Sequence, residues 1–111
     1  MDLRSEIRNG VLVVSVQDGR IDAARAIRFK DGMRELTAGV KGRIILDLAE
    51  VEFIDSSGLG AIVAAMKQLD PAQTLDLACL TPTVEKVFRL TRMDKVFAIH
   101  DSVDSALATS R

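Results

Sequence analysis

The sequence predicts a single α/β domain, with a mixed, mostly parallel sheet that starts with an antiparallel hairpin strand. The chain has 111 residues, which is a common size for one domain with one core. Along most of the chain, strand-like apolar runs alternate with helix-like apolar stripes, as in proteins with right-handed crossovers between parallel strands. An Asn-Gly pair separates the first two strand-like runs and favours a tight antiparallel turn. We therefore expect about four helices in the order ββαβαβαβα, within one domain that spans residues 1–111.

The first half of the chain predicts the hairpin, one helix and a central strand. Strand-like runs at residues 3–7 and 11–16 flank the Asn-Gly turn. A helix is expected from Asp22, because apolar residues then recur at spacings of three or four. These residues are Ala26, Phe29, Met33, Leu36 and Val40. Residues 43–48 predict a strand that is buried on both faces through its middle.

The second half of the chain continues the alternation of helices and strands. The expected elements are a helix over residues 57–69, a strand over 75–80, a short helix from 82 and a strand over 96–99. Pro82 suits the first turn of its helix, because the N–H that proline lacks has no helical partner there. Asp101 or Ser102 can cap a final helix.

Composition excludes several classes of function. Fifteen basic residues stand against sixteen acidic ones, for a net charge of −1, whereas nucleic-acid binding through phosphates needs an excess of Lys and Arg. One cysteine, Cys79, excludes a metal site made of cysteines alone, and with one histidine, His100, a dedicated zinc site would need carboxylates for most of its ligands. No apolar run approaches the roughly 20 residues of a membrane span, and the N-terminus has no signal sequence. We expect a monomeric cytoplasmic protein without a metal, a cofactor, a nucleic-acid partner or a membrane insertion.

The unusual segment is residues 51–60, Val-Glu-Phe-Ile-Asp-Ser-Ser-Gly-Leu-Gly, between the C-terminal end of the central strand and the second helix. Sites of open parallel sheets tend to form outside such strand ends. Asp55, Ser56 and Ser57 all favour a helix start, so one interpretation is purely structural. The other is functional, because the N–H groups and dipole of a helix start favour a phosphate. The two glycines that follow would also let another protein's backbone come close to the serines.

A serine hydrolase is the competing use of these residues. A nucleophile elbow needs a glycine two positions before the serine, and Asp55 occupies that position for Ser57. The imidazole base would have to be His100, at the end of a different predicted strand. Neither a P-loop nor a dinucleotide-binding fingerprint is present. We therefore expect no enzymatic activity.

Residues 47–60 resemble the signature of STAS domains of the bacterial anti-sigma factor antagonist type. The Asp-Ser-Ser-Gly-Leu-Gly core follows a strand that ends in Asp-Leu, and Gly-Arg-Ile-Asp at residues 19–22 matches a second, looser family position. The sequence departs from the family at Ala49-Glu50, where Ser-Gly is often found, and this change leaves the serines intact. The resemblance implies a single STAS domain that binds a partner and is not itself an enzyme.

The resemblance also implies a phosphorylation switch. In the family, the unphosphorylated domain binds an anti-sigma factor that is also a serine kinase of the GHKL ATPase type, and the sigma factor is released. The kinase phosphorylates the second serine of the Asp-Ser-Ser triplet, here Ser57, and a PP2C-type phosphatase removes the phosphate. ATP and magnesium belong to the kinase. Asp55 would shape the loop, and Asp22 would lie beside it and contact the partner.

Local chemistry adds to this partner surface. Ile27 falls off the apolar stripe of the first helix and either packs in the ordinary way or anchors a partner beside the serine loop. Basic residues nearby, among them Arg20 and Arg25, form a solvated face or a docking surface. The candidate partner-binding residues are Asp22, Ile27, Asp55, Ser56, Ser57, Gly58, Leu59 and Gly60. One alternative stays open, a STAS subunit of a transport or other regulatory complex that phosphorylation does not control.

Overall fold

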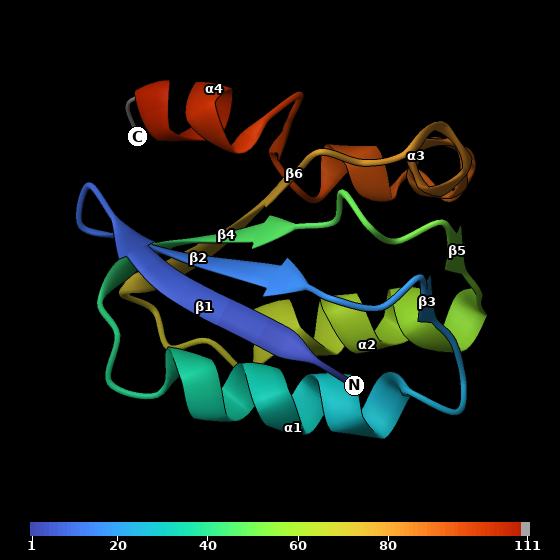
Figure 1. Cartoon of the computed structure of the whole chain (residues 1–111), viewed down its shortest axis with the longest axis horizontal. Coiled ribbons are helices and arrows are strands. Elements are labelled where there is room, and N and C mark those ends of the chain that lie inside the picture. The colour runs from blue at the N-terminus through green and yellow to red at the C-terminus, as the bar shows by residue number, and fades with distance from the viewer. Residues whose placement is uncertain (110–111) are drawn as a thin grey trace.

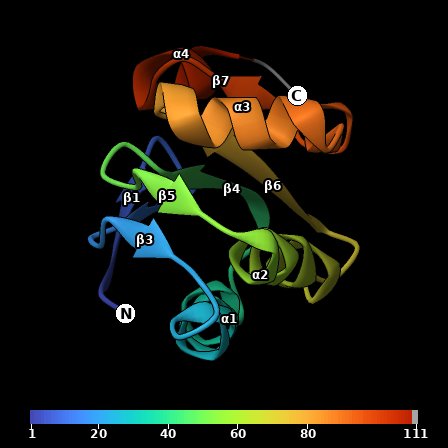
Figure 2. The same ribbon diagram turned by 90° about the vertical axis from the view of Figure 1, so that its right-hand side faces the viewer.

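The structure, a computed structural model, describes residues 1–109 and confirms the predicted fold class. Five strands form one sheet in the order β1-β2-β4-β6-β7 (Figure 1 and Figure 2). Their bounds are β1 Leu3–Arg8, β2 Val11–Val16, β4 Gly42–Asp47, β6 Gln73–Ala78 and β7 Ile99–His100. β1 and β2 pair antiparallel across the predicted turn, and every other neighbouring pair in this sheet is parallel.

Helices cover both faces of the sheet. α1 (Ala26–Thr37) and α2 (Ser56–Lys67) lie side by side on one face, and α4 (Val103–Ala108) lies on the other (Figure 1). α3 (Pro82–Leu90) follows β6 and lies on the same side as α4 (Figure 2). Four helices were expected, and these four match the predicted stripes in order.

The main core lies between the sheet and the layer formed by α1 and α2, and it continues beneath α3 through Val84 and Phe88. Successive side chains of β4 point to opposite faces of the sheet, so they are buried in different clusters. Ile44 and Leu46 are buried in the main core, whereas Ile45 is buried in a smaller cluster beneath α4. The largest buried side chains of the main core include Phe29, Phe88, Ile21, Met33, Ile44, Leu46, Leu48, Ile62 and Leu77. Burial on both faces explains the continuous apolar run of β4.

The first helix begins four residues later than predicted. Residues 22–25 form a turn in which the N–H of Arg25 donates to the carbonyl oxygen of Asp22 at 3.0 Å, and α1 starts only at Ala26. The side chain of Asp22 and the N–H of Ala23 are used in contacts outside the helix. α1 ends at Thr37, two residues before Gly39, whose φ of 76° suits a helix end, so Val40 of the predicted stripe lies beyond the helix.

Two predicted strands have different bounds. β6 ends at Ala78 rather than at Leu80, because Cys79 has a φ of 64°, in the left-handed region that strands do not use. The last strand is β7 rather than residues 96–99. Before it, Met93–Lys95 form a short 3-10 helix, η1, so the chain reaches the edge of the sheet later than predicted.

Two short strands of the structure are not among the predicted elements. β3 (Arg20–Ile21) and β5 (Phe53–Ile54) pair in parallel as a separate two-stranded sheet. β3 leads into α1 and β5 leads into α2, so this small sheet brings the starts of both helices to one end of the molecule (Figure 2). Two residues are too few to show the alternation that marks a strand in a sequence.

Candidate functional site

The predicted site residues gather where β3 and β5 lead into α1 and α2 (Figure 2). Ser56, Ser57 and Gly60 are exposed on the first turns of α2, and Leu59 is half-buried there. Ile27 is 67% exposed on the first turn of α1, so it does not pack into the core. These five residues therefore offer a surface to a partner at one end of the molecule.

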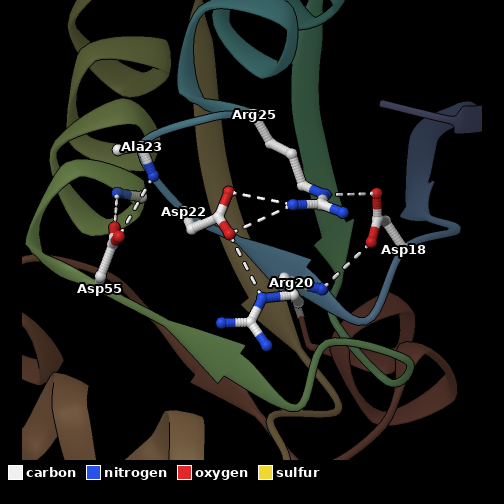
Figure 3. A network of polar contacts seen from close by, with 7 residues as sticks. Asp18, Arg20, Asp22, Ala23, Arg25 and Asp55 are labelled. Carbon is white, nitrogen blue, oxygen red and sulfur yellow. Dashed lines mark hydrogen bonds and ion pairs between the residues drawn. The ribbon is translucent and has the colours of Figure 1, made fainter.

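Asp55 ties the start of α2 to the turn before α1 (Figure 3). It is the N-cap of α2, and its Oδ1 accepts a hydrogen bond from the N–H of Gly58 at 2.8 Å. Its Oδ2 accepts a second bond from the N–H of Ala23 at 3.1 Å. The predicted N-cap role is therefore confirmed. The second bond also places the turn of Asp22 beside the serine loop, as the sequence analysis expected.

Replacement of Asp55 by alanine should lower the free energy of unfolding by about 1–2 kcal/mol, because the N–H groups of Gly58 and Ala23 both lose their acceptor. Asp55→Asn is expected to lose less, since its one amide oxygen can still cap the helix. Urea unfolding followed by circular dichroism measures both values. Equal losses for the two variants would contradict a role that depends on two separate hydrogen bonds.

The two glycines of the serine loop differ in their surroundings. Gly58 is buried, and a Cβ built on it would lie 1.8 Å from the carbonyl oxygen of Ile21. At this position the missing side chain leaves room for β3 and not for a partner, which corrects the expectation from the sequence. Gly60 is exposed, and a Cβ there would meet nothing within 4 Å. Of the two glycines, only Gly60 leaves open space at the surface.

The two serines lie at the surface on the first turn of α2. Ser56 and Ser57 are exposed, and within residues 1–109 neither hydroxyl makes a hydrogen bond. The cap of α2 comes from Asp55, so the helix start does not depend on either serine. Both hydroxyls are therefore open to an enzyme that approaches from the solvent.

A network of charged side chains lies beside the serine loop (Figure 3). Arg25 donates from Nε to Oδ2 of Asp18 at 2.9 Å and from Nη1 to Oδ2 of Asp22 at 3.1 Å. Arg20 donates from Nε to the same oxygen of Asp22 at 3.2 Å. The resemblance implies that Asp22 contacts the partner, but two arginines of its own chain hold its carboxylate. Residues two and three positions away in a turn give no periodic signal for such pairing.

The network also sets the charges of its members. Hydrogen bonding to Arg25 is the main cause that lowers the pKa of the Asp18 carboxyl. Desolvation alone would raise the pKa of Asp22, but hydrogen bonds from Arg25 and Arg20 outweigh it and lower the pKa. The pKa of Arg25 is raised, chiefly by its bond to Asp18. The ionised carboxylates contribute stability above the ordinary aspartate range near 4, and this contribution is lost as the pH falls through their lowered pKa values.

The geometry does not support a hydrolase built on Ser57 and His100. Nε2 of His100 lies 3.1 Å from Oδ2 of Asp76, a carboxylate that is only 1% exposed. The same oxygen accepts a bond from Nη2 of Arg43 at 2.9 Å, and Arg43 also donates to the carbonyl oxygen of Ala106 in α4. His100 thus belongs to a network that joins α4 to the sheet, on the opposite face from α2.

Within residues 1–109, the protein has neither a cluster of potential metal ligands nor a helix that could cross a membrane. In that range, no three His, Cys, Asp or Glu side chains come together in a way that could hold a metal ion. Over the same range, every helix is too short or too polar to cross a membrane.

Comparison with known proteins connects this geometry to one family. The sequence model described as the STAS domain matches residues 2–106. BtrV of Bordetella bronchiseptica is 32% identical over 97% of this chain and 93% of its own length. The anti-sigma-B factor antagonist of Listeria monocytogenes is 34% identical over 73% of this chain and 72% of its own. The crystal structure of an anti-sigma factor antagonist from Mycobacterium paratuberculosis has a TM-score of 0.86 at 29% identity, over 96% of this chain and 91% of that one.

Proposed function

The chain belongs to the STAS domain family, and on this premise we propose that it is an anti-sigma factor antagonist. In the proposed cycle, the unphosphorylated chain binds an anti-sigma factor, which then releases its target. The anti-sigma factor is also a serine kinase of the GHKL type, and it phosphorylates Ser57. The phosphate switches binding off, and a PP2C-type phosphatase restores it. These partners act in the cytoplasm, where we place the chain.

The observation that carries this proposal is the exposed Ser57 hydroxyl on the first turn of α2, without a partner among residues 1–109. A kinase can reach it while the chain stays folded. The names of the Listeria relative and the mycobacterial structure support an anti-sigma factor as the partner. The role is one of binding, so the chain itself needs no cofactor, and ATP and Mg²⁺ belong to the kinase.

A phosphate on Ser57 would change the surface more than the fold. It adds roughly −1.5 to −2 charges at neutral pH. At the N-terminus of the 12-residue helix α2, the N–H groups and the dipole favour this charge. Asp55 holds the helix start independently of the serine. The added charge and its hydration therefore oppose a partner that binds the neutral hydroxyl.

The experiment that tests the proposal is a pull-down from native cytoplasm, with mass spectrometry of phosphorylation sites. We expect a GHKL-type serine kinase to be recovered with the unphosphorylated chain, and phosphate on Ser57 only in the unbound fraction. A Ser57→Ala bait should recover the same kinase, which serves as the control. A transporter ATPase as the recovered partner, with no phosphate on Ser57 under several growth conditions, would instead support the subunit of a transport complex.

A further inference from the structure

An arginine stacks on an exposed aromatic ring beside the serine loop. In the parallel pairing of β3 with β5, Arg20 is the register partner of Phe53. Side chains alternate along each strand, so Ile21 and Ile54 are buried while their neighbours face the solvent. The guanidinium carbon of Arg20 lies 4.4 Å from the centroid of the Phe53 ring, and that residue remains 39% exposed. This arrangement combines a positive charge and an apolar ring on one outward face.

Arg20 is held in place although its side chain is 52% exposed. Its Nε donates to Asp22, its backbone N–H donates to Oδ1 of Asp18 at 3.3 Å, and the ring of Phe53 supports its flat face. The carboxylates of Asp18 and Asp22 are themselves held by ion pairs with Arg25. The terminal nitrogens of Arg20 point away from Asp22 (Figure 3) and have no hydrogen-bond partner among residues 1–109.

This geometry decides which charge the surface offers to a partner. The carboxylate of Asp22 is occupied by Arg20 and Arg25, so it is a poor acceptor for a cation from outside. The two terminal nitrogens of Arg20 remain available, and together they match the two oxygens of a carboxylate. Because Arg20 is already ordered, binding costs less side-chain entropy than at a mobile arginine.

We propose that Arg20, supported by Phe53, is a specificity-determining contact that binds an aspartate or glutamate side chain of the anti-sigma factor. The inference rests on the proposed function, because it assigns the chemistry of the partner at the same end of the molecule. The partner's carboxylate lies across the terminal nitrogens of Arg20, and apolar atoms next to that carboxylate cover the exposed part of the Phe53 ring.

The test uses the full chain and the GHKL-type kinase recovered with it, titrated by calorimetry at two salt concentrations. Arg20→Glu should weaken binding by at least about tenfold, and Arg20→Gln by a smaller factor with a reduced dependence on salt. The matched control is Arg8→Glu, since Arg8 also pairs with an exposed aspartate, Asp104, but lies at the hairpin end of the sheet. This control should bind within about twofold of the original chain.

Thermal melting of each variant shows whether the fold is kept, and Arg20→Gln provides the test if Arg20→Glu does not fold. Unchanged affinity in Arg20→Gln, or equal losses in Arg20→Glu and Arg8→Glu, would overturn the contact while leaving the proposed function intact. If the original chain binds no such kinase, the proposed function fails and the inference fails with it.

Discussion

Replacement of Gly58 by alanine is expected to lower the free energy of unfolding by about 2 kcal/mol or more, which corresponds to a melting temperature roughly 10 °C lower. The added Cβ would lie 1.8 Å from the carbonyl oxygen of Ile21 and 3.0 Å from Cγ1 of Ile54. The first of these is backbone, so β3 or the start of α2 must move. Alanine improves helix propensity by at most about 1 kcal/mol, which offsets only part of this cost.

Gly60→Ala is the matched control, because the same substitution two residues later meets nothing within 4 Å. It should raise the free energy of unfolding by up to about 1 kcal/mol through helix propensity alone. Urea unfolding of the two variants and the original chain measures the difference. If Gly58→Ala were as stable as Gly60→Ala, the close approach of β3 to α2 would be wrong.

Local features of the site could be predicted from the sequence because their causes are local. The Asn9-Gly10 turn is confirmed, since both residues have the positive φ values, 54° and 76°, that this pair tolerates. Asp55 caps α2 as its residue type and position indicated. The central strand was also predictable, because burial on both faces makes a nearly continuous apolar run.

The features that escaped prediction depend on contacts between segments far apart in the chain. Gly58 meets Ile21, which lies 37 positions earlier, and no local pattern marks that approach. The sequence leaves Arg20 on a basic face that is either solvated or a docking surface, and only the pairing of β3 with β5 places it on Phe53. Asp22 is a local exception. Its ion pairs with Arg20 and Arg25 span only two and three positions, but they form in a turn where the sequence predicted the start of a helix.

Substitutions at Ser57 should have the largest effect on function. Ser57→Ala is expected to accept no phosphate and yet to bind the kinase as the original chain does, because the exposed hydroxyl has no structural partner among residues 1–109. Ser57→Asp places a permanent charge where the partner binds a neutral side chain. Binding would remove the carboxylate that this substitution introduces from water without giving it a counterion. The affinity for the kinase should therefore fall by about 100-fold. Phosphorylation assays with labelled ATP and calorimetric titration of the kinase measure the two effects.

Ser56→Ala distinguishes an effect of this one hydroxyl from an effect of the whole loop. Ser56 is also exposed on the same turn, so its loss should leave both phosphorylation and binding nearly unchanged. Stoichiometric phosphate on the Ser57→Ala variant would show that the acceptor is a different residue. Full affinity in Ser57→Asp would show that charge at the start of α2 does not control the partner. In that case the switch would have to act through the phosphate's size or its hydrogen bonds, because the helix start itself tolerates negative charge.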